Sequence, residues 1–306
     1  MSEFKIIKKL TSILSINDKD ILVGFGDDCA CVNVNGKKLL FTADIQVENR
    51  HFIKNKINPI DLGWKLVSVN VSDIVACGGT PRWGVISVAV PKNTEISFLE
   101  EIYNGINKAK NFYKFEIIGG NTSSANEIIF DLFLTGETEK FISRSNAKKG
   151  DLIFISGYTG LSRAGLEILL QDIKNLENFE KELLKHHTRP VARLDLQERI
   201  QKYANSCIDI SDGLVGDLGH ISQMSNKKIV LENIPISPIL EKFAKKYYKD
   251  PLEYALYGGE DYQLAFTVSK ENAKHFKDCL KIGHIEEGKG IYFQDKLLKI
   301  KGFEHF

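Results

Sequence analysis

A Gly-Phe-Gly-Asp-Asp stretch ending in Asp27 and Asp28 constrains the fold more than any other part of the sequence. Its glycines allow a sharp backbone turn immediately before two carboxylates. Residues 29–43 have the alternating pattern of two β-strands on either side of an Asn-Gly turn, which predicts a β-hairpin. Its return strand brings Asp44 back beside the first two acids. Three neighbouring carboxylates repel one another unless a cation lies among them, and Mg²⁺ or Mn²⁺ prefers such oxygen ligands. A solvated, Asp-rich turn is the alternative interpretation of this stretch alone.

The composition is that of an ordinary globular protein. The chain has 306 residues, which predicts two domains rather than one. Hydrophobic residues make up 43% and charged residues 26%, and the net charge of +1 gives no indication of a nucleic-acid-binding surface. No apolar run approaches the ~18 residues of a membrane span. The five cysteines form no CxxC pair and the first residues do not resemble a signal peptide, so we expect a cytoplasmic location.

The order of the predicted elements indicates an α+β domain over residues 1–140 and an α/β domain over residues 148–306. A polar segment between them, short of apolar residues, marks the boundary. The sheet of the first domain is expected to be largely antiparallel. We predict helices over residues 4–14, 59–77, 95–113 and 214–224, and strands over 82–90, 115–118 (buried), 127–138, 151–156, 207–208 and 262–268. Either Ser211 or Asp212 suits the N-cap of the last helix.

Several acids lie at turns or at the ends of predicted elements. Any one of them could simply be a helix cap or a paired core residue. Together they suggest a site where Mg²⁺ holds a polyphosphate, because the chain lacks the P-loop pattern and a complete dinucleotide-binding fingerprint. The G-x-S-x-G and H-E-x-x-H motifs are also absent. The acids are Asp27, Asp28, Asp44, Asp73, Asp209 and Asp212.

Three further features fit phosphate binding. The Gly119-Gly120 pair would let backbone N–H groups approach a phosphate, although a plain turn explains it equally well. His51 lies close to the predicted acidic cluster, where it could touch a substrate phosphate, and the alternative is a structural histidine. Arg144 could clamp phosphate through its guanidinium, or be a solvated side chain between the domains.

Seven motifs, in order along nearly the whole chain, resemble the thiamine-monophosphate kinase family of the aminoimidazole-ribonucleotide synthetase superfamily. The last two, in their order and spacing, are the specific ones, whereas the Gly-Asp turn alone is not. The motifs are Gly24-Phe25-Gly26-Asp27-Asp28, Thr42-Ala43-Asp44, Glu48 with His51-Phe52, Asn70-Val71-Ser72-Asp73, Gly119-Gly120-Asn121-Thr122, Asp209-Ile210-Ser211-Asp212-Gly213-Leu214 and Leu256-Tyr257-Gly258-Gly259-Glu260-Asp261.

The resemblance implies an N-terminal mixed sheet with helices that forms a barrel across a homodimer, and a C-terminal α/β domain over the cleft. It implies ATP as co-substrate and several Mg²⁺ ions, whereas the net charge and the lack of a long apolar run predict no nucleic-acid or membrane partner. The positions matching metal ligands are Asp27, Thr42, the Ala43 carbonyl, Asp44, Asp73, Asn121, Asp209 and Asp212. Those matching ATP contacts are Gly120, Asn121, Arg144 and Ser211, and those matching thiamine-phosphate contacts are His51, Glu260 and Phe303. Asn121 replaces the family's usual Asp and brings no charge, which implies a weaker metal site there.

The activity implied is phosphoryl transfer from ATP to thiamine monophosphate, giving thiamine diphosphate. The transfer is direct and in line, so no residue is expected to become phosphorylated. Another ATP-using synthetase of the same superfamily is the alternative enzyme, and a D-x-D-x-T phosphohydrolase is disfavoured because the motif at Asp209 lacks the second Asp. A non-catalytic nucleotide-binding module is the alternative from a different class.

Overall fold

The computed structural model describes residues 3–171, 173 and 175–300 of the chain. The N-terminal half contains a six-stranded sheet in the order β1-β2-β3-β6-β4-β5. All of its pairings are antiparallel except β4–β5, as expected for an α+β unit. The strands are β1 (Ile21–Val23), β2 (Ala30–Val34), β3 (Lys37–Val47), β4 (Thr80–Val90), β5 (Glu116–Ser124) and β6 (Ile129–Thr138).

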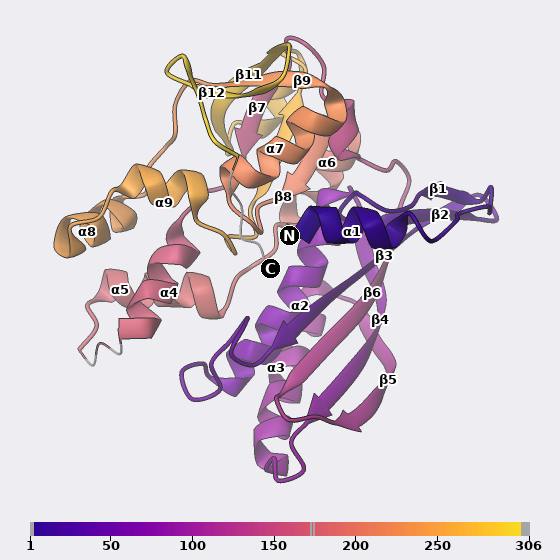
Figure 1. Cartoon of the computed structure of the whole chain (residues 1–306), viewed down its shortest axis with the longest axis vertical. Coiled ribbons are helices and arrows are strands. Elements are labelled where there is room, and N and C mark those ends of the chain that lie inside the picture. Colours follow the sequence, from indigo (N-terminus) through magenta and orange to yellow (C-terminus); the bar gives the residue numbers. More distant parts are fainter. Residues whose placement is uncertain (1–2, 172, 174, 301–306) are drawn as a thin grey trace.

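Two helices, α2 (Pro59–Ala76) and α3 (Ile96–Tyr113), cover one face of this sheet (Figure 1). The Asn58 side chain accepts a hydrogen bond from the Ile60 N–H and caps α2, as the Asn-Pro pair predicted. A Cβ atom on Gly63 of α2 would lie 2.0 Å from the Ile102 carbonyl oxygen of α3. The lack of a side chain at this position therefore allows the two helices to pack with their backbones in close contact.

Strand β5 differs from the predicted short, buried strand over residues 115–118. It runs from Glu116 to Ser124 and is exposed along most of its length, with Ile118 67% exposed. The reason is its place at the end of the sheet, where it pairs with β4 alone. A run of apolar residues indicated burial, but an edge strand has only one neighbour to bury it.

The C-terminal half is built on a seven-stranded sheet in the order β13-β12-β9-β11-β7-β10-β8. Its only parallel pairing among the described residues is β9–β12, so this half is also α+β in character. The prediction of a two-domain fold with mixed sheets and helices is confirmed. The strands are β7 (Leu152–Ile155), β8 (Ala204–Asp209), β9 (Lys227–Leu231), β10 (Leu264–Val268), β11 (Leu280–Glu287), β12 (Gly290–Phe293) and β13 (Lys296–Leu297).

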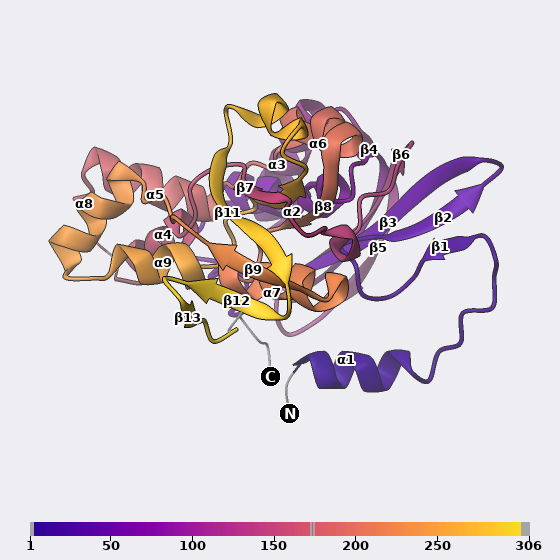
Figure 2. The ribbon, with the colours of Figure 1, turned by 90° about the horizontal axis from the view of Figure 1, so that it is seen from above.

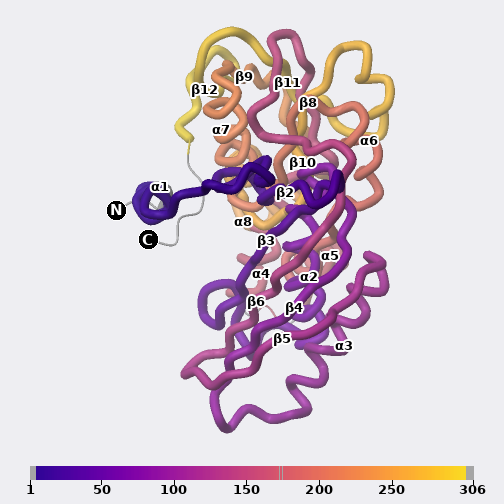
Figure 3. The backbone as a smooth tube through the Cα atoms, turned by 90° about the vertical axis from the view of Figure 1, so that its right-hand side faces the viewer, coloured from indigo at the N-terminus to yellow at the C-terminus, as the bar shows by residue number. Residues whose placement is uncertain are grey.

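The helices of the C-terminal half lie on two sides of this sheet (Figures 1 and 2). They are α4 (Leu161–Gln171), α5 (Asn178–Thr188), α6 (Gln197–Tyr203), α7 (Leu214–Ser225), α8 (Pro238–Tyr247) and α9 (Pro251–Tyr257). The first helix of the chain, α1 (Glu3–Thr11), projects away from the body of the molecule (Figures 2 and 3). No helix in the described part of the chain is both long and apolar enough to cross a membrane.

The two halves share apolar packing as well as a connecting segment. Phe154 and Phe266 of the second sheet belong to the same buried cluster as α2 and the first sheet. The Trp64 indole of α2 donates a 2.7 Å hydrogen bond to the Pro190 carbonyl oxygen, and the Arg189 guanidinium lies 4.2 Å from the Trp64 ring centre. These contacts fix α2 against the C-terminal half, which brings the motif residues of both halves together.

Candidate active site

A cavity of about 560 Å³ lies where the two halves meet. Its walls come from β3, α2, α4, α5 and the loops that precede β2 and follow β8. Most of the residues that the sequence singled out line it, although they are far apart in the chain. They are Asp27, Asp28, Thr42, Ala43, Asp44, His51, Asp73, Arg144, Asp209, Ser211, Asp212 and Glu260.

Strand β3 presents an open edge to this cavity. Its pairing with β2 ends at Phe41, opposite Ala30, so the following residues of β3 are paired only with β6. Helix α2 covers part of the open edge. Thr42 Oγ1 donates a 2.6 Å hydrogen bond to Asp73 Oδ2, and the Asp44 N–H donates a 3.0 Å hydrogen bond to Asn70 Oδ1. The Asn-Val-Ser-Asp motif of α2 thus holds the Thr-Ala-Asp motif of β3 in place.

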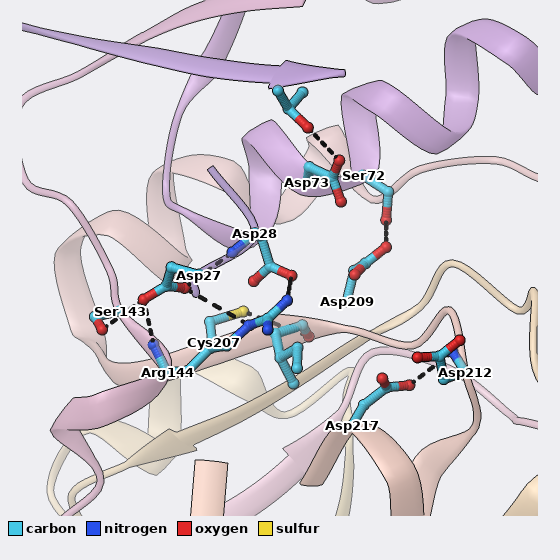
Figure 4. Close-up of polar contacts among 12 residues, drawn as sticks. Asp27, Asp28, Ser72, Asp73, Ser143, Arg144, Cys207, Asp209, Asp212 and Asp217 are labelled. Carbon is cyan, nitrogen blue, oxygen red and sulfur yellow. Dashed lines mark hydrogen bonds and ion pairs between the residues drawn. The ribbon is translucent and has the colours of Figure 1, made fainter. Parts of the chain in front are cut away.

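Asp27 and Asp28 are bound to the segment that joins the two halves (Figure 4). Asp27 Oδ2 accepts a 2.7 Å hydrogen bond from Ser143 Oγ and a 3.3 Å hydrogen bond from the Arg144 N–H. The Arg144 guanidinium forms an ion pair with Asp28. Burial, together with the charge of Asp28, raises the pKa of Asp27 to about 6. Arg144 is therefore the counterion of this acid pair rather than a solvated side chain.

Asp28 also belongs to a second group of carboxylates, which converges from three different parts of the chain. Asp28, Asp73 and Asp209 each offer an oxygen atom, and these atoms lie within 4.8 Å of one another. Ser72 Oγ donates a 2.8 Å hydrogen bond to Asp209 Oδ2, so α2 contributes one member of the cluster, Asp73, and contacts another. Burial, followed by the neighbouring carboxylate charges, raises the pKa values of Asp73 and Asp209 well above their ordinary range.

The donor set of this cluster fits a hard divalent cation. All three groups are carboxylates, which Mg²⁺ prefers over nitrogen or sulfur. Asp28 Oδ2 is buried and has no hydrogen-bond partner within the described residues. A buried carboxylate oxygen without a donor is costly, and a cation among the three groups would remove that cost.

Asp212 and Ser211 line the cavity but do not cap α7, so the predicted N-cap is wrong. The N-cap is Gly213, whose φ angle of 116° no L-residue adopts easily. The cap interaction comes from within the helix, because Asp217 Oδ2 accepts hydrogen bonds from the N–H groups of Asp212 (3.2 Å) and Gly213 (3.1 Å) (Figure 4). Buried Asp217 thereby fixes the loop that carries Ser211 and Asp212 at the cavity wall.

Glu260 and His51 lie at another part of the cavity wall. Glu260 has a left-handed backbone, with φ 61°, and its N–H donates a 2.7 Å hydrogen bond to the Ser211 carbonyl oxygen. His51 Nδ1 accepts a 2.9 Å hydrogen bond from the Val47 N–H. Because Nδ1 is the acceptor, the neutral ring carries its proton on Nε2, which is left as the donor.

Two predicted site residues in the described part of the chain, Gly120 and Asn121, are not brought into the cavity. Both lie on the edge strand β5. A Cβ atom on Gly120 would lie 2.0 Å from the Ile86 carbonyl oxygen of β4, so this glycine is required by strand packing. Phe303 lies outside the described residues.

Comparisons with known proteins agree with this geometry. Residues 26–138 match the family described as AIR synthase related protein, N-terminal domain. The thiamine-monophosphate kinase of Aquifex aeolicus is 48% identical over 283 residues, covering 92% of each chain. That of Buchnera aphidicola subsp. Schizaphis graminum is 39% identical over 327 residues, covering 100% of this chain and 99% of the relative.

The chain belongs to the thiamine-monophosphate kinase family. A solved structure described as AaThiL complexed with AMPPCP and TMP superposes with a TM-score of 0.94 at 46% identity, covering 100% of this chain and 97% of that one. The resemblance inferred from the motifs and the predicted enzyme class, a kinase, are confirmed.

Two residues of the thiamine-monophosphate kinase site escaped the sequence analysis. Lys65 lies in the largely buried helix α2, is itself fully buried, and its Nζ lies 2.7 Å from Glu260 Oε1. His187 of α5 lies on the other side of the same carboxylate, with Nδ1 3.4 Å from Glu260 Oε2. A lysine in a helix that is apolar around much of its circumference was the available signal for the first, since a buried charge requires a partner.

Proposed function

We propose that this chain transfers the γ-phosphoryl group of ATP to thiamine monophosphate, giving ADP and thiamine diphosphate. The observation that carries the proposal is the convergence of Asp28, Asp73 and Asp209 in the cavity that Glu260 and His51 also line. A set of carboxylates suits a metal–polyphosphate complex. A single carboxylate beside an imidazole donor suits a cationic acceptor that carries a phosphate.

The carboxylate cluster would hold Mg²⁺, which when bound neutralises the phosphate charges. The ligands we propose are Asp28, Asp73 and Asp209 of this cluster, together with the motif positions Asp27, Thr42, the Ala43 carbonyl, Asp44, Asn121 and Asp212. For ATP we propose Arg144 and Ser211, which line the cavity, and Gly120 and Asn121, which lie outside it on β5 and are assigned from the family motif alone. For the acceptor we propose His51, Glu260 and Phe303.

The reaction needs no covalent intermediate on the protein. An oxygen of the acceptor phosphate forms the new bond to the γ-phosphorus, and the bond from that phosphorus to the bridging oxygen of ADP breaks. The attacking oxygen is already anionic at neutral pH, so no side chain has to remove a proton. The task of the residues is to hold the two phosphates in line and to compensate their charge.

We further propose that two copies associate through the N-terminal sheet. Helices α2 and α3 cover one face of this sheet (Figure 1), and several apolar side chains of its strands are exposed. Ile45 is 45% exposed, Trp83 40% and Phe133 38%, while Ile118 lies on the open edge strand β5. Such exposed apolar side chains and an open edge favour burial against a second copy. Sedimentation of a monomer at micromolar concentration would refute the dimer.

We also propose that the protein is located in the cytoplasm. All five cysteines are free, buried thiols, which suits a reducing compartment such as the cytoplasm.

A coupled ADP-release assay tests the activity. We expect ADP formation to require ATP, Mg²⁺ and thiamine monophosphate together. A non-catalytic nucleotide-binding module would bind ATP and release no ADP. Another synthetase of the superfamily would release ADP with a different phosphorylated acceptor, so a panel of acceptors separates the two alternatives from the proposal.

A further inference from the structure

A lysine buried between the two halves stands directly behind the proposed acceptor site. Lys65 of α2 has 0% exposure and is one of the largest fully buried side chains of the described chain. A buried ammonium group requires a counter-charge, and the Glu260 carboxylate supplies it at 2.7 Å. The pair crosses from the N-terminal helix to the C-terminal Gly-Gly-Glu-Asp turn. It is therefore an interdomain ion pair at the wall of the cavity.

Among the described residues, the Lys65 ammonium group has no second carboxylate partner. Glu260 is the only carboxylate in ion-pair contact with Lys65 in the described part of the chain, and Nζ donates no well-aligned hydrogen bond elsewhere. His187 lies on the far side of the carboxylate, and its Nδ1 is also 3.1 Å from Ser162 Oγ. Burial, together with the Lys65 charge, lowers the pKa of His187 to about 3, so this ring is neutral at physiological pH. Of the two contacts, Lys65 alone brings a full positive charge.

The backbone of Glu260 is fixed from a different direction. Its N–H is bound to the Ser211 carbonyl oxygen, and a Cβ atom on the preceding Gly259 would lie 2.6 Å from that same oxygen. The turn is thus pressed against the loop that we assign to the nucleotide. The side chain keeps 29% of its surface exposed to the cavity. The carboxylate is held from behind, and its remaining surface faces the space proposed for the acceptor.

We propose that Lys65 is a positioning residue for the acceptor: by pairing with Glu260 across the domain interface, it fixes the carboxylate that selects a cationic, amine-bearing acceptor. This inference rests on the proposed function, because it takes thiamine monophosphate as the acceptor. Lys65 itself is not among the residues that line the cavity and acts through Glu260. The expected signature is a selective loss of acceptor affinity when Lys65 is replaced.

The charge state of Glu260 gives a second signature. Burial acts to raise the pKa of Glu260, but the charge of Lys65, with His187 and His51, brings it below its ordinary value. Without Lys65 the largest effect that opposes burial is lost, so the carboxylate binds a proton at higher pH. The groups that face Glu260 or lie next to it are Lys65 of α2, His187 of α5, His51 after β3, Arg163 of α4, and its neighbours Asp261 and Tyr262.

Steady-state kinetics of Lys65→Met and Lys65→Arg test the proposal. In Lys65→Met we expect KM for thiamine monophosphate to rise on the order of 10- to 100-fold, with KM for ATP within about twofold of wild type. Its kcat/KM for the acceptor should recover as the pH is raised from 6 to 8.5, more steeply than in wild type. Lys65→Arg keeps the charge and should retain most of the affinity. The matched control is Lys246→Met, which removes a lysine 2.8 Å from the buried Glu180. Neither residue lines the cavity, so both KM values should stay unchanged.

A double variant keeps the test decisive if Lys65→Met does not fold. Removing both charges in Lys65→Met/Glu260→Gln avoids an uncompensated buried carboxylate. If Lys65 acts through Glu260, the double variant should have the same acceptor KM as Glu260→Gln alone. A further rise in the double variant, an equal rise in both KM values, or no change in Lys65→Met would overturn the proposal. If the wild-type protein releases no ADP with thiamine monophosphate, the proposed function is wrong, and so is the assignment of thiamine monophosphate as the acceptor. An active wild type with an unaffected Lys65→Met refutes only the role of Lys65.

Discussion

Two parts of the cavity wall, the acidic cluster and the region around Glu260, differ in how their negative charge is compensated. In the acidic cluster, Asp28, Asp73 and Asp209 gather with Arg144 as the cation in contact with the first of them. At the acceptor side, the single carboxylate of Glu260 has its own buried cation at 2.7 Å. The cluster has an excess of negative charge that a ligand must compensate. The Glu260 carboxylate is already compensated by the buried Lys65 ammonium group. We conclude that the first region is built to bind cations and the second to present a carboxylate.

The largest effect that separates the two regions should come from removing Mg²⁺. With EDTA in excess, we expect ADP formation to fall to background, because the cluster can no longer hold a metal–polyphosphate complex. Adding Mg²⁺ back at about 100 times its Kd should raise Tm by roughly 4 °C. Differential scanning fluorimetry measures the shift, with potassium at equal ionic strength as the control. An equal shift with potassium would contradict a specific site.

The next effect should come from Asp209→Asn. We expect kcat to fall on the order of 10³-fold, since a ligand of the cluster loses its charge. Without Mg²⁺ the Tm should stay level or rise, because the variant relieves repulsion between buried carboxylates. The matched control is Asp278→Asn, a surface partner of Arg199 at 2.6 Å, which should leave kcat unchanged. A variant that loses activity only because it unfolds would show a lower Tm and argue against this reading.

A smaller effect is expected for Asp217→Ala. It leaves the N–H groups of Asp212 and Gly213 without their acceptor, at a cost of about 1–3 kcal/mol in the free energy of unfolding. We also expect KM for ATP to rise several-fold as the loop loosens. Urea unfolding and initial-rate kinetics measure the two changes. Asp217→Asn retains an oxygen acceptor and should lose less on both counts, so an equal loss would contradict the capping role.

The smallest effect is a pH dependence of stability due to His187. Its pKa is lowered to about 3 in the folded chain, against about 6.5 unfolded, so its contribution to stability is fully present above pH 6.5 and is lost as the pH falls. The loss is at most about 1.4 kcal/mol per pH unit. His187→Asn should lack it. We therefore expect the difference in unfolding free energy between wild type and variant to shrink from pH 7.5 to 5.5, and a constant difference would refute the assignment.

Local sequence patterns were sufficient for much of the acidic cluster. The hairpin returns Asp44 toward Asp27 because an Asn-Gly turn fixes the register of neighbouring strands, and Asp73 follows from a helix with a clear N-cap and stop. Such features depend on residues close in the chain. The family motifs added Asp209 and Glu260, which no local pattern would have placed beside them.

The remainder depends on contacts between distant segments. In the sequence, Lys65 is a single lysine on a helix that is apolar around much of its circumference, and its partner lies in the other half of the chain. Asp217 was missed because it caps α7 from within the helix rather than from the preceding position. The apolar residues at the start of β5 indicated burial, whereas the strand lies at the end of its sheet. Burial and pairing of this kind are decided by tertiary packing.

Helix α2 has a consequence for the size of molecule that the site can accept. Lys65 reaches Glu260 near its start, Ser72 reaches Asp209 and Asp73 reaches Thr42 near its end. At 1.5 Å per residue, Lys65 and Asp73 are about 12 Å apart along the axis. The helix therefore fixes the distance between the group that faces the acceptor and the groups that face phosphate. Inserting one residue between Lys65 and Asp73 would rotate one of them by about 100° about the helix axis relative to the other. The length of the acceptor that fits the site is therefore determined by the number of helical residues between these two positions.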